Sequence, residues 1–318
     1  MQSRHCLSSV VAALLLITLR TTLAHSQAPS LISMWSYPQT NGEDFAPTGV
    51  AVDASRLVYV LDASANSKVR VFSPTGTQLR QWGSFGKGAG QFEWPVDIAV
   101  DHLGNVFVKD GFQAQRMEKF TSTGTLLTTW ACGGSGTCVD AANHVWVAND
   151  GAVEEYTGSG TRLATFPLGG SGADGVAVSR TGNFYVAFRD VGVVRKYSPN
   201  GTFLRGWTVS GSWPVRLAVD SKDFVYVVEY NTGQVEMFDA NGVFVSRWGT
   251  QGSAPGQFLS PIGITIDDAN DVYIADHSNS RIQVFGPTAL TPTAAMSWGR
   301  LKNMYDPAAQ APARTLAR

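Results

Sequence analysis

A unit of roughly forty residues recurs six times along this 318-residue chain, and this periodicity constrains the fold more than any other feature. Each copy begins with a short apolar segment that ends in aspartate, or in serine in the fourth copy. These closing residues are 39 to 48 positions apart and are Asp53, Asp101, Asp140, Ser179, Asp220 and Asp267.

Every copy contains four short apolar segments, and Gly, Asn, Asp and Ser fill the gaps between them. The first copy shows the pattern in residues 47–53, 57–62, 68–72 and 81–83. Alternating runs rich in Val, Ile, Tyr and Phe, separated by turn residues, are typical of a β-meander. Six such units predict an all-β fold, a six-bladed β-propeller of four-stranded antiparallel blades.

The motifs resemble those of the NHL repeat family. The closest copies read PTGVAVD (47–53) in the first unit, and PIGITID (261–267), DVYIAD (271–276) and RIQVF (281–285) in the sixth. The resemblance covers roughly residues 31–300, and copies three and four depart most from the pattern. It implies a propeller fold strongly but a function only weakly, because NHL propellers serve as enzymes, sensors and scaffolds.

Two features predict how the blades pack and how the ring closes. Small residues such as Gly49 and Gly175 in the first strands let neighbouring blades approach closely, and a late aromatic in each copy packs between blades. Residues 34–47, ahead of the first full copy, also resemble the end of a blade. We therefore expect the segment around residues 32–36 to complete the last blade, which removes exposed sheet edges.

The ends of the chain predict processing and location. Residues 1–24 are typical of a secretory signal peptide cleaved after Ala24, with a membrane anchor as the alternative. We assign residues 30–300 to the propeller and expect the Ala/Pro-rich tail, 301–318, to be disordered. The sequence thus predicts a secreted or periplasmic protein that does not span the membrane. A net charge of −1 argues against nucleic acid as a partner.

Two cysteines, Cys132 and Cys138, follow the predicted signal peptide, and an exported protein favours a disulfide between them. The repeat places them at an outer and an inner strand, roughly 14 Å apart at ~4.8 Å per strand. A disulfide needs Cα atoms within ~7 Å. The glycine-rich linker 133–136 offers a way to close the gap, so both states stay open.

The family resemblance also suggests an alternative function, that of a metal-dependent lyase or hydrolase. The related peptidyl-hydroxyglycine amidating lyase binds zinc through histidines at the shaft of its six-bladed propeller. The matching blade entrances here hold no histidine: Thr48, Gly49, Val96, Asp97, Asp174, Gly175, Val215, Arg216, Ile262 and Gly263. We therefore predict no metal-ligating or catalytic residues, although oxygen ligands for Ca²⁺ in the shaft remain an option.

A meander places its turns alternately at the two ends of the ring. The turns after the second strands and the blade entrances therefore share one face, on which acidic and basic side chains gather. We predict a ligand-binding site there, formed by Asp97, Lys109, Asp174, Arg189, Arg216 and Glu229. The alternative is that such carboxylates cap turns within each blade. The predicted protein is a monomeric binding or scaffold module for a protein, peptide or glycan.

Overall fold

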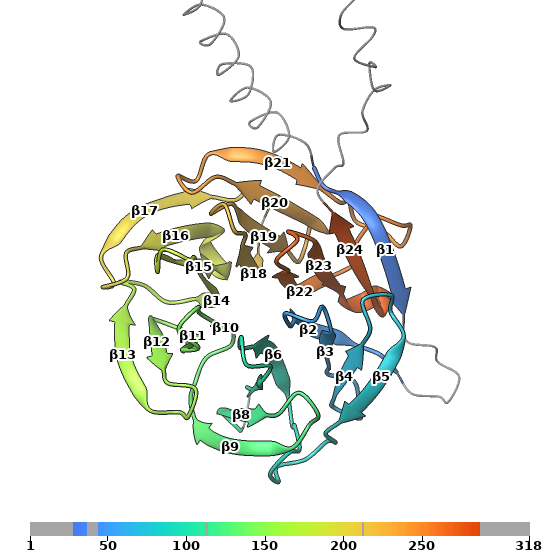
Figure 1. The fold of residues 1–318 in the computed structure, drawn as a ribbon. Helices are drawn as coiled ribbons and strands as arrows, with labels where there is room; N and C mark the ends of the chain where they lie inside the picture. Colours follow the sequence, from blue (N-terminus) through green and yellow to red (C-terminus); the bar gives the residue numbers. More distant parts are fainter. Residues whose placement is uncertain (1–27, 37–43, 112–113, 212, 287–318) are drawn as a thin grey trace, which may run out of the picture. The chain divides into compact units, whose positions relative to one another are not determined.

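The computed structural model describes residues 28–36, 44–111, 114–211 and 213–286. In this part of the chain, six four-stranded antiparallel sheets form a ring around a central shaft, which confirms the predicted propeller (Figure 1). The predicted signal peptide and the Ala/Pro-rich tail lie outside the described residues. Within those residues, no helix is long and apolar enough to cross a membrane.

The inner strands of blades 1 to 6 line the shaft and are β2 (Pro47–Val52), β6 (Pro95–Val100), β10 (Thr137–Val139), β14 (Ala173–Val178), β18 (Pro214–Val219) and β22 (Pro261–Ile266). The second strands are β3 (Val58–Asp62), β7 (Val106–Asp110), β11 (Val145–Asn149), β15 (Phe184–Phe188), β19 (Val225–Glu229) and β23 (Val272–Asp276). The third strands are β4 (Lys68–Phe72), β8 (Arg116–Phe120), β12 (Ala152–Tyr156), β16 (Val193–Tyr197), β20 (Gln234–Phe238) and β24 (Arg281–Gly286). The outer strands are β5 (Gln78–Trp82), β9 (Leu126–Ala131), β13 (Arg162–Pro167), β17 (Phe203–Thr208), β21 (Phe244–Trp248) and β1 (Ser30–Ser36).

Blade 6 combines the two ends of the propeller. Its strand order is β1-β24-β23-β22, so the first strand in the chain is its outer strand. Strand β1 pairs antiparallel with β24, with Trp35 opposite Ile282. The prediction that an N-terminal segment closes the ring is thereby confirmed.

The hydrophobic core is divided into six clusters, each of which lies between two adjacent blades. The late aromatic of one blade meets the third-strand aromatic of the next: Trp82 lies 5.9 Å from Phe120, and Trp248 lies 5.9 Å from Phe285, between ring centroids. Each cluster therefore joins neighbours in the ring, and burial of these large rings stabilises the whole circle of blades.

Glycine is required where the blades approach most closely. A Cβ on Gly124, whose φ is +93°, would lie 2.7 Å from the Trp82 ring. In the shaft, a Cβ on Gly49 would lie 2.9 Å from Ile98 of the next blade. The predicted role of small residues in the inner strands is therefore visible in the structure.

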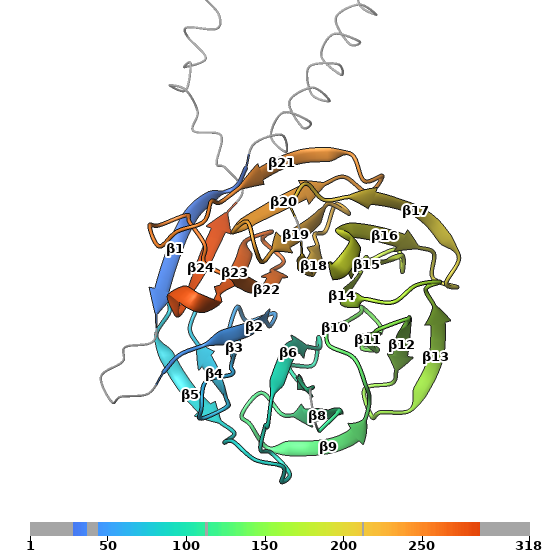
Figure 2. The same ribbon diagram turned by 180° about the vertical axis from the view of Figure 1, so that it is seen from behind.

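The two ends of the ring differ in the turns they carry (Figures 1 and 2). We call the end with the turns between inner and second strands, such as 53–57, the first-turn face. The end with the turns after the second strands, such as 63–67, is the second-turn face. The short 3₁₀ helices η1 (Arg189–Val191) and η2 (His277–Asn279) directly follow second strands and so lie on the second-turn face.

Both cysteines of the propeller are free thiols in the structure. Cys132 packs in the cluster between blades 2 and 3, whereas Cys138 packs against the cluster between blades 3 and 4. The sheet of blade 3 thus separates the two side chains, which is why the linker does not bring them together.

Burial should also make these thiols unreactive. It raises the pKa of Cys132 to about 11 and raises that of Cys138 further. Because the thiolate is the reactive species, we expect neither cysteine to react with a thiol reagent at pH 8 in the native protein, and both to react after unfolding in guanidinium. Peptide mapping of the labelled sites measures this. A missing label on both residues in the unfolded, non-reduced protein would indicate a disulfide instead.

Candidate functional site

A pocket of about 690 Å³ opens on the second-turn face, at the mouth of the shaft. Blade entrances and second-strand turns from all around the ring form its wall. Its lining residues are Ala46, Thr48, Ala63, Trp94, Pro95, Val96, Ser135, Asp174, Arg189, Trp213, Val215, Arg216, Tyr230, Ile262 and His277. The volume is in the range of small-molecule sites, and most of the lining is apolar, as in most ligand pockets.

Aromatic side chains stand exposed around this pocket. Trp94 is 54% exposed and Trp213 is 44% exposed. The Trp213 ring lies 6.3 Å from the ring of Tyr230, and the Arg189 guanidinium lies 5.5 Å from the Trp213 ring centroid. Large aromatic rings that remain in water are costly to a soluble protein, and such exposure at a concave site is typical of recognition.

The backbone at Trp213 supports the same conclusion. Its φ is +74°, in the left-handed region that bulky side chains rarely adopt. Strain of this kind persists only where the surrounding structure imposes it, and it is concentrated at functional sites. The linker before blade 5 therefore holds an exposed indole in a conformation that its own backbone disfavours.

The floor of the pocket is a buried ion-pair network centred on Arg216. Its Nε lies 3.0 Å from Oδ2 of Asp97, and its Nη1 lies 3.1 Å from Oδ1 of Asp174. Nη2 donates to the carbonyl of Val96 at 3.2 Å. The backbone N–H of Thr137 donates to the same Asp97 oxygen at 2.8 Å. The network thus ties together blades 2, 3, 4 and 5.

The repeat explains why one pair can reach across the ring. Asp97 and Arg216 occupy the third position of inner strands β6 and β18, which belong to opposite blades. The equivalent repeat position in the other four blades, four residues before the closing Asp or Ser, is glycine: Gly49, Gly136, Gly175 and Gly263. The missing side chains leave room in the shaft for the two charged residues.

This pair separates two cavities. Below it, a space of about 240 Å³ follows the shaft towards Asp53 and His102 on the first-turn face, and Arg216 lines both this space and the pocket. Because both carboxylates already bind the guanidinium, a Ca²⁺ ion here would have to compete with Arg216 for its ligands. At the position where the sequence suggested oxygen ligands for Ca²⁺, the structure thus has an ion pair that forms the floor of the pocket.

The six residues predicted as ligand-binding divide into two groups. Asp174, Arg189 and Arg216 line the pocket, and Asp97 lies in the floor just beneath it. Arg189 is the most accessible of them; its Nη1 lies 3.3 Å from Oδ2 of Asp174, and its side chain is 42% exposed.

The two remaining predicted residues, Lys109 and Glu229, are fully buried and do not line the pocket. Lys109 donates to the carbonyl of Asp110 at 3.3 Å, and burial lowers its pKa. Glu229 accepts hydrogen bonds from the N–H of Gly211 and the hydroxyl of Thr232, and burial raises its pKa. Neither side chain can contact a ligand in the pocket without leaving its buried position.

Glu229 follows the rule that carboxylates at the end of second strands hold the preceding linker. Asp62 accepts from the N–H of Ala46 at 3.0 Å, and Asp276 accepts from the N–H of Leu259 at 2.7 Å. The turn-capping alternative therefore describes these carboxylates, because each satisfies backbone donors that would otherwise be buried without partners.

Sequence reasoning did not assign the aromatic residues of the pocket to a site. Trp94 and Trp213 each stand directly before the proline that begins an inner strand, outside the blade-packing positions. Their position before the proline, where the repeat needs no aromatic for packing, was the sequence signal that could have identified them as site residues. Tyr230 follows the second strand of blade 5, and only the ring geometry brings it against Trp213.

The comparisons with known proteins agree with this architecture. The profile of the NHL repeat matches residues 46–72 and 258–285. The chain is therefore a six-bladed β-propeller in which two segments, in blades 1 and 6, match the NHL repeat. No curated protein sequence matches it significantly.

Solved structures show the same fold at low sequence identity. Virginiamycin B lyase from Staphylococcus aureus matches with a TM-score of 0.59 and 13% identity, covering 81% of this chain and 89% of the lyase. A catalytically inactive variant of that lyase with quinupristin matches with a TM-score of 0.59 and 14% identity, covering 81% and 89%. A chain of the nidogen/laminin complex matches with a TM-score of 0.53 and 18% identity, covering 64% of this chain and 80% of the other. At these identities the likeness concerns the fold alone.

Proposed function

We propose that this propeller is an exported binding module that captures a protein or peptide segment in the pocket of the second-turn face. The observation that carries this proposal is the pair of exposed indoles, Trp94 and Trp213, at a concave and mainly apolar site. Tryptophan, tyrosine and arginine are the residues that dominate binding energies at protein interfaces, and Trp213, Tyr230 and Arg189 occur here together.

The chemistry of the pocket defines the segment it would take. Trp94, Pro95 and Ile262 offer apolar surface for an aliphatic or aromatic side chain. The exposed Arg189 offers donors to a carboxylate or carbonyl of the ligand. A structural neighbour of the same fold comes from the nidogen/laminin complex, and this likeness is consistent with the proposed recognition of a protein segment.

The rigid ring beneath the pocket supports a role in recognition. Inner strands from every blade converge on the shaft, and the Arg216 network ties four of them together. A pocket on such a base loses little conformational freedom when it binds, so more of the contact energy appears as affinity. The leader-like segment 1–24 is the basis for proposing that the module acts outside the cytoplasm.

Selection of a phage-displayed random peptide library on the full chain tests this proposal. Trp213→Ala should weaken the selected peptides about tenfold or more, because a central aromatic anchor contributes on the order of 2 kcal/mol. Leu103→Ala is the matched control, since Leu103 is 77% exposed on the first-turn face. Affinities measured by surface plasmon resonance should be unchanged in this variant.

The outcomes are distinct. Peptides that bind the wild type and the Trp213→Ala and Trp94→Ala variants equally would place the site elsewhere. If the library yields no peptide while a glycan array gives ligands that depend on Trp213, the pocket is a site but the ligand class is wrong.

A further inference from the structure

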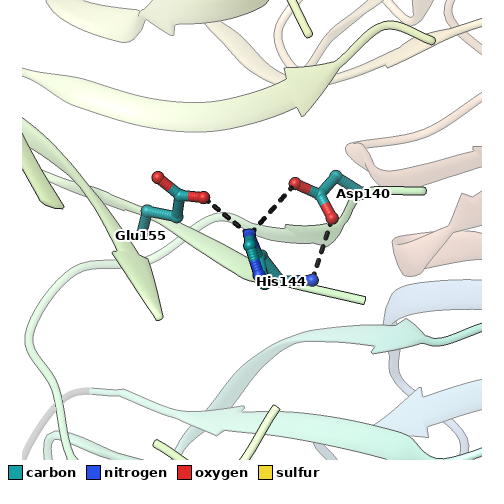
Figure 3. A group of neighbouring side chains, drawn as sticks. All are labelled: Asp140, His144 and Glu155. Atoms are coloured by element: carbon teal, nitrogen blue, oxygen red, sulfur yellow. Dashed lines mark hydrogen bonds and ion pairs between the residues drawn. The ribbon is translucent and has the colours of Figure 1, made fainter. Parts of the chain in front are cut away.

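A second cluster of polar side chains lies in blade 3 on the first-turn face, away from the pocket. Asp140 directly follows β10, His144 directly precedes β11, and Glu155 belongs to β12. Nδ1 of His144 lies 2.8 Å from Oε1 of Glu155 and 3.8 Å from Oδ2 of Asp140. Figure 3 shows the two carboxylates on either side of this ring nitrogen.

The position of Asp140 is determined by the repeat. Its Oδ1 accepts hydrogen bonds from the N–H groups of Ala142 and His144, and its Oδ2 accepts from Nε1 of Trp146 at 2.9 Å. Blades 1, 5 and 6 use the same arrangement, with a tyrosine hydroxyl in place of the indole: Tyr59 to Asp53, Tyr226 to Asp220 and Tyr273 to Asp267. The turn thus holds one carboxylate rigidly, whether or not a ligand is present.

The other two members occur only in blade 3. The blade-2 counterparts of His144 and Glu155 are Asn105 and Lys119, and Lys119 donates to the carbonyl of Gly158 in the next blade. The repeat therefore needs neither an imidazole nor a carboxylate at these positions. Blade 3 alone adds both to the preformed aspartate.

The three donor atoms lie within 4.8 Å of one another. Around a tetrahedral Zn²⁺, with bonds of ~2.0–2.2 Å, neighbouring ligand atoms are separated by roughly 3.3–3.6 Å. The observed separations of 2.8 and 3.8 Å lie on either side of that value, so small side-chain rotations would bring all three atoms to one ion.

We propose that Asp140, His144 and Glu155 form a binding site for a divalent transition-metal ion such as Zn²⁺. One imidazole and two carboxylates suit Zn²⁺, whereas Ca²⁺ takes oxygen ligands alone. The His144 side chain is 34% exposed, so the ion can enter from solvent and keep a water as its fourth ligand. The site would stand apart from the pocket, because it lies on the opposite face of the ring.

Titration of the tag-free chain with ZnCl₂ by isothermal calorimetry tests the proposal, with CaCl₂ as a second probe. We expect one equivalent of Zn²⁺ to bind and Ca²⁺ not to compete for it. His144→Ala and Glu155→Gln should each weaken binding about tenfold or more. His102→Ala is the matched control, because His102 lies in the corresponding turn of blade 2, where no such cluster is found among the described residues.

A second readout separates binding from folding. Zn²⁺ should raise the melting temperature of the wild type and of His102→Ala, but not that of His144→Ala, because only the folded state presents the site. The melting temperatures without metal verify that the variants fold. An absence of stoichiometric Zn²⁺ binding, or equal affinity in His144→Ala, would overturn the proposal and leave His144 and Glu155 as a hydrogen-bonded pair.

Discussion

Arg216→Ala is expected to lower the free energy of unfolding by about 3–5 kcal/mol, because it breaks a buried ion pair by removing one partner. Arg216 and Asp97 are 7% and 6% exposed, so the variant leaves a carboxylate buried without its cationic partner. It also removes the hydrogen bonds to the carbonyl of Val96 across the shaft and to the carbonyl of Asp174 in the neighbouring blade. Urea denaturation followed by tryptophan fluorescence measures the loss.

The double variant Asp97→Ala/Arg216→Ala provides the control. Removing both charges eliminates the unpaired carboxylate, so the double variant should be more stable than the sum of the single effects predicts. Additive losses would mean that the pair is not coupled, contrary to the 3.0 Å contact.

The same network predicts a pH dependence. Burial raises the pKa of Asp97, and Arg216 opposes that rise. Without Arg216, the folded state should bind the Asp97 proton more tightly than the unfolded state does. The difference in free energy of unfolding between the wild type and Arg216→Ala should therefore be smaller in acid. It should grow as the pH rises through the raised pKa of Asp97 in the folded variant. A difference between variant and wild type that is constant from pH 5 to pH 8 would contradict this origin.

Trp35→Ala should destabilise the protein by a similar amount, about 3–5 kcal/mol, because it removes a buried indole from the closing strand. Trp35 is 9% exposed, and its ring lies 6.3 Å from that of Phe72 in blade 1. The side chain thus joins the last blade to the first. Strand β1 comes from the N-terminal part of the chain, whereas the other three strands of blade 6 come from its C-terminal part. Loss of the Trp35 contact therefore weakens the attachment of β1 to its partner, β24.

Thermal unfolding with hydrogen exchange of the β24 amides measures this effect. Ile32→Ala is the control, because Ile32 lies on the same strand and is 54% exposed. If Trp35→Ala leaves both the melting temperature and the β24 exchange unchanged, closure does not depend on this strand.

The architecture was accessible to sequence reasoning because it is local and repeated. Each blade is a meander of neighbouring strands, so the period of turns and apolar runs defines it without knowledge of distant contacts. The glycine positions and late aromatics recur in register, and the blade-like segment before residue 47 predicted the closing strand. The turn-capping carboxylates, such as Asp62 and Asp276, were also within reach, since they accept from backbone N–H groups of the adjacent turn or the preceding linker.

The sites depend on residues that depart from the repeat, and the contacts of these residues are harder to predict from the sequence than the repeated fold. Sequence analysis selected Asp97 and Arg216 as charged residues at the blade entrances of one face, but it did not pair them. It also placed Lys109 and Glu229 on the correct face while missing their complete burial. The turn to which a residue belongs determines on which face of the propeller it lies. Whether its side chain is buried or exposed depends on how the adjacent blade packs against it.

The amino-acid sequence by itself determined the number of blades, their strand order and the segment that closes the ring, because all of these follow from hydrophobic periodicity along the chain. Only the tertiary structure decided that Arg216 binds Asp97, 119 positions away, and that indoles from blades 2 and 5 border one pocket. The physical reason is ring closure. It sets opposite blades a shaft's width apart, and that distance depends on how all six interfaces pack together rather than on any single repeat.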